Sequence, residues 1–463
     1  MVIAKIFLIF INIIHKPKEG VFLRHKNDKD FCYWSLRAVI KKWPVWLARQ
    51  LSFPALETLL LKVFGVKTFF SNSLSEGWVD CEFIEFGKNV KIGQGSLVVS
   101  NIIVKDKIII KKVNIKDNVI IGAHSVVLPG TIIDSNSILD TISLTTVNQH
   151  LEANSTYRGV PAKKIGSTGF ISDETRFTAE IFKKGEVADY DLEDLKAHGK
   201  ELSVPFHFYI IAGWTIIGFS FVLPGFVFFL FFFGFLTPNL FGKSISLKLL
   251  LDVKTFLILI LTPLIFIGIY LLHLFFVALF TKWFYKRADK KGPSQGVFDR
   301  NLDESSKVLD YYHFRSFLFK YPIFAFIRSP FPWLLNWELR FIGSNKVGKA
   351  TTLEDTFFHS HINFGQNCYV GTYAHITNHL VDGVYGDENL TFFGVQIGDK
   401  SAFSLSSGVL PGTEIGENSN ILPFSATIKF DKLGKNGIYG GFPSRRLNDE
   451  EVKKFLGDEY SDE

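Results

Sequence analysis

Two stretches of the chain repeat a six-residue pattern in which a buried-type aliphatic residue is followed by glycine, polar or small residues. The pattern is clear in Ile121-Gly-Ala-His-Ser125 and Val127-Leu-Pro-Gly-Thr131, and again in Val370-Gly-Thr-Tyr-Ala374 and Val409-Leu-Pro-Gly-Thr413. No helix has this period, whereas a short strand followed by a turn does. The pattern therefore predicts a solenoid in which each hexad forms one side and three hexads form one coil.

These stretches lie in two copies of a longer unit. Residues match at a constant offset of 278 positions, as in Tyr33/Tyr311, Arg37/Arg315, Pro44/Pro322 and Gly93/Gly371. A four-residue insertion in the second copy raises the offset to 282, at which the two Val-Leu-Pro-Gly-Thr hexads match. Residues present twice describe the fold, so residues present once are candidates for an added function.

An amphipathic stretch that contains prolines precedes each solenoid, at 31–72 and 309–345. Aromatic residues alternate there with Lys and Arg, and the prolines divide each stretch into pieces too short to cross a bilayer. This pattern predicts helices that lie at a membrane surface. The alternative is that these helices only cap the adjoining solenoid.

Between the copies, two runs without Asp, Glu, Lys or Arg extend from Pro205 to Leu236 and from Thr255 to Phe280. Each is long enough to cross a hydrocarbon core of about 30 Å at about 1.5 Å per residue. The basic segment Lys282–Lys291 follows, so the positive-inside tendency predicts an integral membrane protein with both solenoids in the cytoplasm. Pro224-Gly225 leaves open a hairpin that would add a crossing.

Composition agrees with membrane association. Hydrophobic residues make up 47% of the 463 residues, with 49 Phe, and the net charge is +6. The basic residues gather beside apolar segments, which favours lipid headgroups over nucleic acid as the partner. Cys32, Cys81 and Cys368 lack a CxxC spacing, so neither a disulfide framework nor a cysteine metal site is predicted.

The predicted fold class is mainly β, with two parallel β-helix domains, each preceded by amphipathic helices, joined by a transmembrane helical segment. The expected order is an N-terminal anchor segment (1–30), amphipathic helices (31–72), the first β-helix (73–166), a linker (167–204), about two spans (205–281), a basic linker (282–308), amphipathic helices (309–345), the second β-helix (346–447) and a disordered acidic tail (448–463).

Over roughly residues 80–166 and 355–447, the hexads resemble the left-handed β-helix of the hexapeptide-repeat acyltransferases. Each block also ends as that family does, in Arg158-Gly-Val-Pro and Gly440-Gly-Phe-Pro. The resemblance implies left-handed coils and transfer of an acyl group, most simply acetyl, from acetyl-CoA or another acyl-CoA to a small-molecule, glycan or lipid-linked acceptor. It implies no metal, and since related enzymes form trimers, a homo-oligomer is a further expectation.

His379 stands opposite Asn101 of the first copy, directly before the insertion. An imidazole titrates near pH 6.5, so at neutral pH it is mostly an unprotonated base. In the galactoside, maltose and xenobiotic O-acetyltransferases a histidine just before a loop that leaves the solenoid is the general base. His379, which is followed here by the insertion, matches that position. Asp382 is a candidate for orienting its ring or binding the acceptor.

His361 lies one coil before His379 at the same hexad position, so the two rings are expected to stack about 4.8 Å apart. Each would then disfavour the charged form of the other. In related acyltransferases the end of the solenoid lies near coenzyme A, which makes Arg445, Arg446 and Gly412 candidates for contacting the donor.

Three other functions remain open. The γ-class carbonic anhydrases hold zinc with three histidines on such a solenoid, and candidates here are His359, His361, His375 and His379, although the last pair is spaced differently. Two solenoids joined by spans also resemble the terminal region of polylysine-synthetase-like nonribosomal peptide enzymes, which permits an aminoacyl donor on a carrier protein. A noncatalytic membrane scaffold is the third, and His124 and His150 of the first copy are weaker catalytic candidates.

Overall fold

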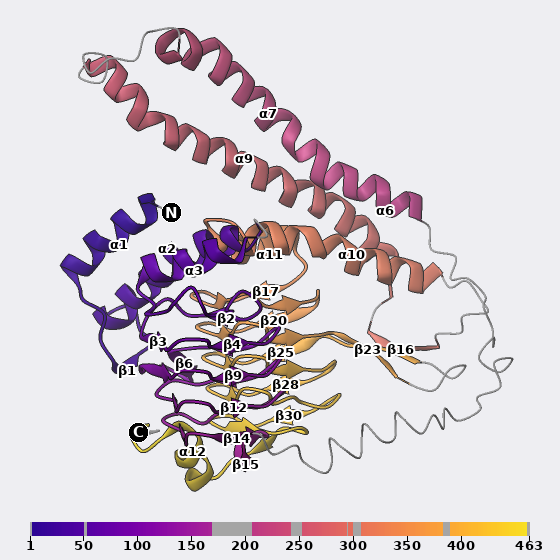
Figure 1. Ribbon diagram of the computed structural model, residues 1–463. Coiled ribbons are helices and arrows are strands. Elements are labelled where there is room, and N and C mark those ends of the chain that lie inside the picture. The colour runs from indigo at the N-terminus through magenta and orange to yellow at the C-terminus, as the bar shows by residue number, and fades with distance from the viewer. Residues whose placement is uncertain are drawn as a thin grey trace, which may run out of the picture.

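The computed structural model describes residues 2–50, 53–168, 206–241, 252–293, 295–299, 307–382 and 389–460. Most of the predicted linker at 167–204 lies outside these residues. Two stacks of short parallel strands stand side by side, and helices cover one end of both (Figure 1).

The first stack has three faces, each a sheet of parallel strands. Along one face Ile120 pairs with Ile138 and Ile138 with Thr156, so the partner on the next coil lies three hexads further along the chain. The predicted coil of three hexads is therefore present. The strands of the first stack are β2 (Trp78–Val79), β3 (Ile84–Phe86), β4 (Lys91–Ile92), β5 (Leu97–Val98), β8 (Val113–Ile115), β9 (Ile120–Ile121), β10 (Val126–Val127), β11 (Ile132–Ile133), β12 (Ile138–Leu139), β13 (His150–Leu151), β14 (Ser155–Arg158) and, antiparallel to β14, β15 (Lys163–Ser167).

The second stack repeats this register, since Gln396 pairs with Glu414 and Glu414 with Lys432. Its strands are β17 (Lys346–Val347), β18 (Thr352–Leu353), β19 (Phe357–Phe358), β20 (Ile362–Phe364), β21 (Tyr369–Val370), β22 (His375–Ile376), β25 (Val395–Ile397), β26 (Ala402–Phe403), β27 (Gly408–Val409), β28 (Glu414–Ile415), β29 (Asn420–Ile421), β30 (Lys432–Leu433), β31 (Ile438–Gly440) and, antiparallel to β31, β32 (Arg445–Arg446).

The hexad sequence explains both the core and the corners of the coils. The inward aliphatic residues, such as Ile121 and Leu139, are fully buried. Asn118, Asn136 and Asn154 occupy corners with positive φ, a conformation that asparagine tolerates better than most residues. Their side-chain amides form a ladder, with Asn118 donating to Asn136 over 3.0 Å and Asn136 to Asn154 over 3.1 Å.

A hairpin leaves the coil at the same place in both stacks. In the second it is β23 (His379–Asp382) and β24 (Asn389–Phe392), with β16 (Gly296–Asp299) as a third antiparallel strand. In the first it is β6 (Asn101–Val104) and β7 (Lys107–Ile110), with β1 (Gly20–Leu23). The insertion in the second copy therefore lengthens a hairpin that the first copy also has.

The helices over the end of each stack also correspond. They are α1 (Val2–Ile14), α2 (Lys29–Gln50) and α3 (Pro54–Phe64) in the first copy, and α9 (Val253–Lys291), α10 (Lys307–Ile327) and α11 (Leu335–Ile342) in the second. Pro44 and Pro322 lie inside α2 and α10 instead of dividing them as expected.

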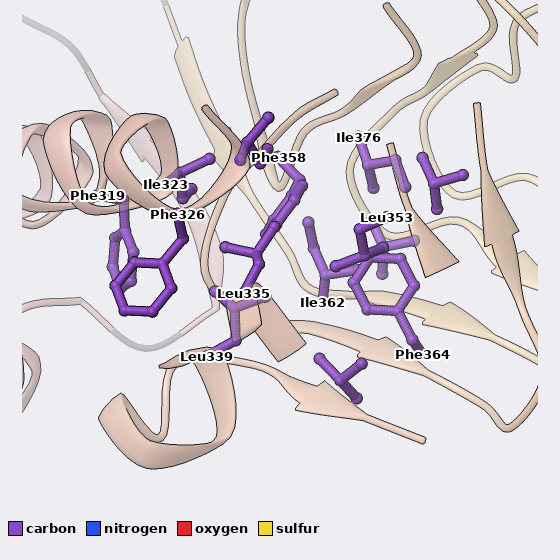
Figure 2. Packing of buried hydrophobic residues seen from close by; sticks show 14 of the residues in the cluster. Phe319, Ile323, Phe326, Leu335, Leu339, Leu353, Phe358, Ile362, Phe364 and Ile376 are labelled. Carbon is purple, nitrogen blue, oxygen red and sulfur yellow. The ribbon is translucent and has the colours of Figure 1, made fainter. Parts of the chain in front are cut away.

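These helices cap the coils, as Figure 2 shows for the second copy. Phe319 and Phe326 of α10 and Leu335 of α11 pack with Phe358 and Ile362 of the first strands. Each of these side chains is at most 3% exposed, so the helices close the open end of the hydrophobic core.

Two helical segments, His207–Phe241 and Val253–Lys291, are long and apolar enough to cross a membrane. The first consists of α6 (Phe206–Gly213), the π-helical segment Trp214–Gly218, a 3-10 turn, α7 (Val222–Phe229) and the π-helical segment Leu230–Phe241. They run side by side away from the stacks (Figure 1), and only 17% and 11% of their most apolar windows are buried. The core helix of a soluble protein would bury most of such a window.

The two stacks pack against each other through an apolar cluster to which both contribute. Leu97 and Leu128 of the first belong to it with Leu405 and Leu422 of the second. The Lys42 ammonium also pairs with the Glu354 carboxylate across the boundary.

The acidic tail contributes to the same cluster. Its residues Asp449–Leu456 form α12, in which Val452, Phe455 and Leu456 are buried on one face. The expected disorder after residue 448 is therefore wrong for this segment, because these apolar residues recur at helical spacing.

Candidate functional site

His379 begins β23, at the point where the hairpin leaves the second stack, and its ring is half-buried. Its Nδ1 lies 3.1 Å from Asn378 Oδ1 and 3.3 Å from Thr377 Oγ1. The amide of Asn378 donates to Ser360 O over 2.6 Å, which turns its Oδ1 toward the histidine. The Thr377 hydroxyl donates its proton to His379 O over 2.8 Å, so both neighbours of Nδ1 are acceptors, Nδ1 carries the proton and Nε2 keeps its lone pair.

Burial keeps this imidazole neutral. It lowers the pKa of His379 to about 4, and the nearby His313 and Arg315 contribute to the same shift. At neutral pH the ring is therefore unprotonated and can accept a proton.

The ring in contact with His379 is His359, not His361 as predicted. The His359 and His379 centroids are 4.4 Å apart at an interplanar angle of 84°. Burial, followed by the charge of His379, lowers the pKa of His359 to about 3. His361 instead occupies a corner with φ of 62°, which directs its ring away from the strand face and against Phe392, at 5.3 Å between centroids.

His361 and His379 therefore do not lower each other's pKa as expected, and His361 has other partners. The His361 Nε2 lies 3.6 Å from Asp289 Oδ1, and its Nδ1 lies 3.0 Å from Ser360 Oγ. Burial, followed by the positive charge of Arg315, lowers the pKa of His361, while Asp289 acts in the opposite direction.

Arg315 of α10 connects these groups, and the sequence analysis did not select it. Its side chain is 1% exposed, and Nη1 donates to Asp289 Oδ1 over 3.2 Å. The guanidinium lies 4.7 Å from the centroid of Phe392. Within the described part of the chain, Nη2 has no hydrogen-bond acceptor. We call the group formed by His359, His361, His379, Arg315 and Asp289 the histidine site.

The first copy has a different chemistry at the matching place. Arg37, which matches Arg315, donates from Nε to Glu82 Oε1 over 2.8 Å, and Lys41 binds the same oxygen at 2.7 Å. Glu82 corresponds to Ser360 at the offset of the two copies. The first copy therefore has at this position a carboxylate that binds its buried arginine, whereas the second has a hydroxyl that lies beside His361 Nδ1. The exchange of Glu82 for Ser360 is visible when the two copies are aligned, and it could have identified Arg315 as a candidate.

Asp289 had no comparable signal, because it lies in the basic segment after the predicted span. Its position in the site depends on α9 continuing as one helix to Lys291. The membrane-type helix thereby places a carboxylate beside Arg315 and His361.

A cavity of about 100 Å³ lies between the two copies, beside Asn101, which matches His379. Both copies line it, with Trp34 and Asp80 from the first and Glu354 and Tyr369 from the second. Asp80 accepts from the Asn101 amide over 2.6 Å, and burial raises its pKa to about 6. The hydrogen bond to the Asp80 carboxylate thus holds the first residue of the first hairpin against its coil.

Of the remaining predicted residues, Arg445, Arg446 and Gly412 have other surroundings. Asp382 ends β23 opposite Asn389, but its side chain lies outside what the structure describes. Arg445 and Arg446 form β32 at the far end of the second stack, where Arg445 Nη1 binds Glu451 over 2.9 Å. A side chain at Gly412 would meet the ring of Phe430 at 2.4 Å, so this glycine permits a close approach between coils.

A zinc site would need at least three suitable ligands close together. Among the described residues, no group of three His, Cys, Asp or Glu side chains has that arrangement. His375, one of the four candidates, points outward and is exposed.

No protein-family model and no curated protein matches the chain. Solved structures do show a similarity. A maltose O-acetyltransferase from Clostridium difficile 630 is 16% identical, over 28% of this chain and 87% of that one, with a TM-score of 0.23. Galactoside acetyltransferase in complex with coenzyme A is 19% identical, over 29% and 83%, with a TM-score of 0.22.

A hexapeptide-repeat-containing acetyltransferase from Vibrio cholerae is 16% identical, over 28% of this chain and 90% of that one, with a TM-score of 0.22. These similarities each cover less than a third of the chain.

Proposed function

We propose that this protein is a membrane-bound acyltransferase. It moves an acyl group, most simply acetyl, from a thioester such as acetyl-CoA to a hydroxyl or an amine, with His379 as the general base. The observation that carries this proposal is the neutral imidazole of His379, held through Nδ1 with Nε2 available at the base of the hairpin.

The proposed reaction is a direct transfer. His379 Nε2 takes the proton of the acceptor hydroxyl or amine as its oxygen or nitrogen bonds to the thioester carbon. The carbonyl oxygen gains negative charge, and the carbon–sulfur bond then breaks. The proton on His379 passes to the departing thiolate, so the products are the acylated acceptor and a free thiol.

Arg315 is suited to bind an anionic oxygen in this reaction. Among the described residues its Nη2 lacks a partner, and a buried donor in that state binds an oxygen more strongly than one exposed to water. The positive charge also lowers the pKa of His379, so an anion bound to Arg315 would raise that pKa toward the neutral range where a base works best.

The proposal also covers the fold and the location. Both β-helices would be left-handed, as the resemblance implies, and the apolar runs and the basic segment after them would make the protein integral to the membrane with both β-helices in the cytoplasm. Arg445, Arg446 and Gly412 would contact the donor, and Asp382 the acceptor. The two exposed apolar helices support the membrane part of the proposal.

The test is thiol release from acetyl-CoA by the detergent-purified full chain, with a panel of glycan, lipid and amine acceptors. His379→Ala should lower acceptor-dependent release by about 10² to 10⁴-fold, the usual contribution of a general base. His150→Ala is the matched control, because His150 is an exposed first-copy histidine paired with Asp134. Equal release by the His379 variant and the wild type would rule out His379 as the base.

A further inference from the structure

A groove of about 730 Å³ runs along α9 where its apolar part ends. Leu279 and Trp283 form its apolar end. Trp283 is 49% exposed, and the guanidinium of Arg287 lies 3.9 Å from its ring centroid. A half-exposed tryptophan at the end of an apolar helix is typical of the level of the lipid headgroups.

The rest of the groove is basic. It is lined by Lys282, Lys286, Arg287 and Lys290, and one carboxylate, Asp289, is present. Within the described residues, no ion pair joins Lys286, Arg287 or Lys290 to a carboxylate. The opposite face of the helix, with Thr281, Tyr285 and Ala288, is buried against the protein. The side chains of Lys286, Arg287 and Lys290 are therefore exposed and, within the described residues, not engaged in ion pairs.

Asp289 is the point where this groove meets the histidine site. Its carboxylate lines the groove and contacts Arg315 at 3.2 Å and His361 at 3.6 Å. A molecule in the groove that extends past Asp289 would therefore reach Arg315 and the histidines. The groove and the histidine site thus share the Asp289 carboxylate.

We propose that the acyl acceptor is an anionic membrane lipid whose phosphate lies among Lys282, Lys286, Arg287 and Lys290, with the free hydroxyl or amine of its headgroup at His379. This inference rests on the proposed acyltransferase function. The transferred acyl group bonds to that headgroup oxygen or nitrogen, and the thiol of the donor leaves. A soluble phosphate compound would satisfy the basic side chains but not Leu279 and Trp283, so we commit to a lipid.

Native mass spectrometry of the delipidated full chain tests the binding. The protein is offered an equimolar mixture of dioleoyl phosphatidylglycerol and dioleoyl phosphatidylcholine, with glycerol phosphate as a soluble competitor. The wild type should retain phosphatidylglycerol selectively and resist the competitor. Lys282→Gln/Lys286→Gln/Lys290→Gln should lower this retention by on the order of 100-fold, since three lysines near an anionic headgroup are lost.

The matched control is Lys432→Gln/Lys435→Gln/Lys453→Gln, which removes three exposed lysines from the second copy away from α9. It should retain the lipid as the wild type does. Equal retention of the two lipids by the wild type, or equal retention of phosphatidylglycerol by the groove variant and the control, would overturn the lipid site. The wild-type selectivity remains informative even if a variant fails to fold.

Transfer of label from radiolabelled acetyl-CoA then tests the lipid acceptor and the proposed acyltransferase function separately. Label should enter the organic extract with phosphatidylglycerol, and both the groove variant and His379→Ala should reduce it, but only the groove variant should lose lipid retention. Transfer to soluble acceptors alone would refute the lipid acceptor and leave the acyltransferase standing. Selective retention without transfer to any acceptor would support the lipid site and contradict the acyltransferase.

Discussion

Two buried arginines, Arg37 and Arg315, occupy the same position in the two copies but have different partners. Arg37 donates to Glu82, which Lys41 also binds, so this cluster holds two cations on one carboxylate. Arg315 donates to Asp289, and within the described chain its Nη2 has no partner. The exchange of glutamate for serine thus leaves the second arginine without a carboxylate at the position where the first copy has one.

Ser360→Glu should convert the second site to the chemistry of the first. The introduced carboxylate is expected to reach Arg315, as Glu82 reaches Arg37, and to block binding of an anionic oxygen there. We expect acyl transfer to fall at least about 10-fold, mainly through a higher KM, with stability changed by about 1 kcal/mol or less. Steady-state kinetics and thermal unfolding measure the two effects.

Ser360→Gln is the control for this prediction, because it adds a side chain of the same size without the charge. It should retain more activity than Ser360→Glu. Equal losses in the two variants would show that crowding, and not the charge on Arg315, causes the effect.

The histidine pair makes stability depend on pH. The folded pKa values of His379 and His359 are about 4 and about 3, below the unfolded value of about 6.5. Between pH 6.5 and 4 the unfolded chain binds protons that the folded chain does not, so the free energy of unfolding falls as the pH is lowered. Thermal unfolding midpoints in detergent should decrease across this window.

His359→Gln/His379→Gln should flatten that part of the pH dependence, because the substituted side chains do not titrate. A wild-type midpoint that stays constant or rises between pH 6.5 and 4 would contradict the assignment of two neutral buried imidazoles.

Among the elements, the second hairpin lies close to the backbone of the corner residue His361. A Cβ added at Gly394, two residues after β24, would lie 2.7 Å from His361 O. Backbone contacts this short cannot be relieved by a side-chain rotation. The position of Phe392 over Arg315 and His361 thus depends on this glycine.

Gly394→Ala should displace β24 from His361 and loosen the histidine site. We expect about 1 to 3 kcal/mol loss of stability, the usual range for overpacking, and about 10-fold or greater loss of acyl transfer. Gly434→Ala is the control, since its nearest neighbour would be 3.5 Å away. Thermal unfolding and thiol release measure both variants, and unchanged activity of Gly394→Ala would argue against this role for the hairpin.

Elements were predictable where the pattern is local. The hexads predicted the strands and their pairing across three hexads. This was possible because aliphatic residues are usually buried, so their spacing shows which positions face inward. The first hairpin, β6 and β7, has only Lys105-Asp106 between its two short, mainly aliphatic strands and carries no glycine or proline to mark its turn. The helix α12 was missed because the acidic residues of its first turn obscured Val452, Phe455 and Leu456.

Across the whole molecule, the two stacks share one apolar cluster, so we expect them to unfold together. Leu422→Asp places a charge at a position that is 2% exposed between the stacks. A buried unpaired charge costs several kcal/mol, so the unfolding midpoint should fall and a single calorimetric transition should divide into two.

Ile428→Asp makes the same change at a position of the second copy that is 46% exposed, and should have little effect. If Leu422→Asp unfolds in one transition at the wild-type midpoint, the cluster does not couple the two copies.

The sequence alone determined the hexad coils, the duplication, the two apolar helices and the position of His379 directly before the insertion. Each of these depends on residue type and spacing within one segment. Only the tertiary structure decided that His359 and not His361 contacts His379, and that Arg315 and Asp289 join the site. The reason is physical, because these contacts join segments far apart in the chain and depend on where each side chain points after the helices have packed onto the coils.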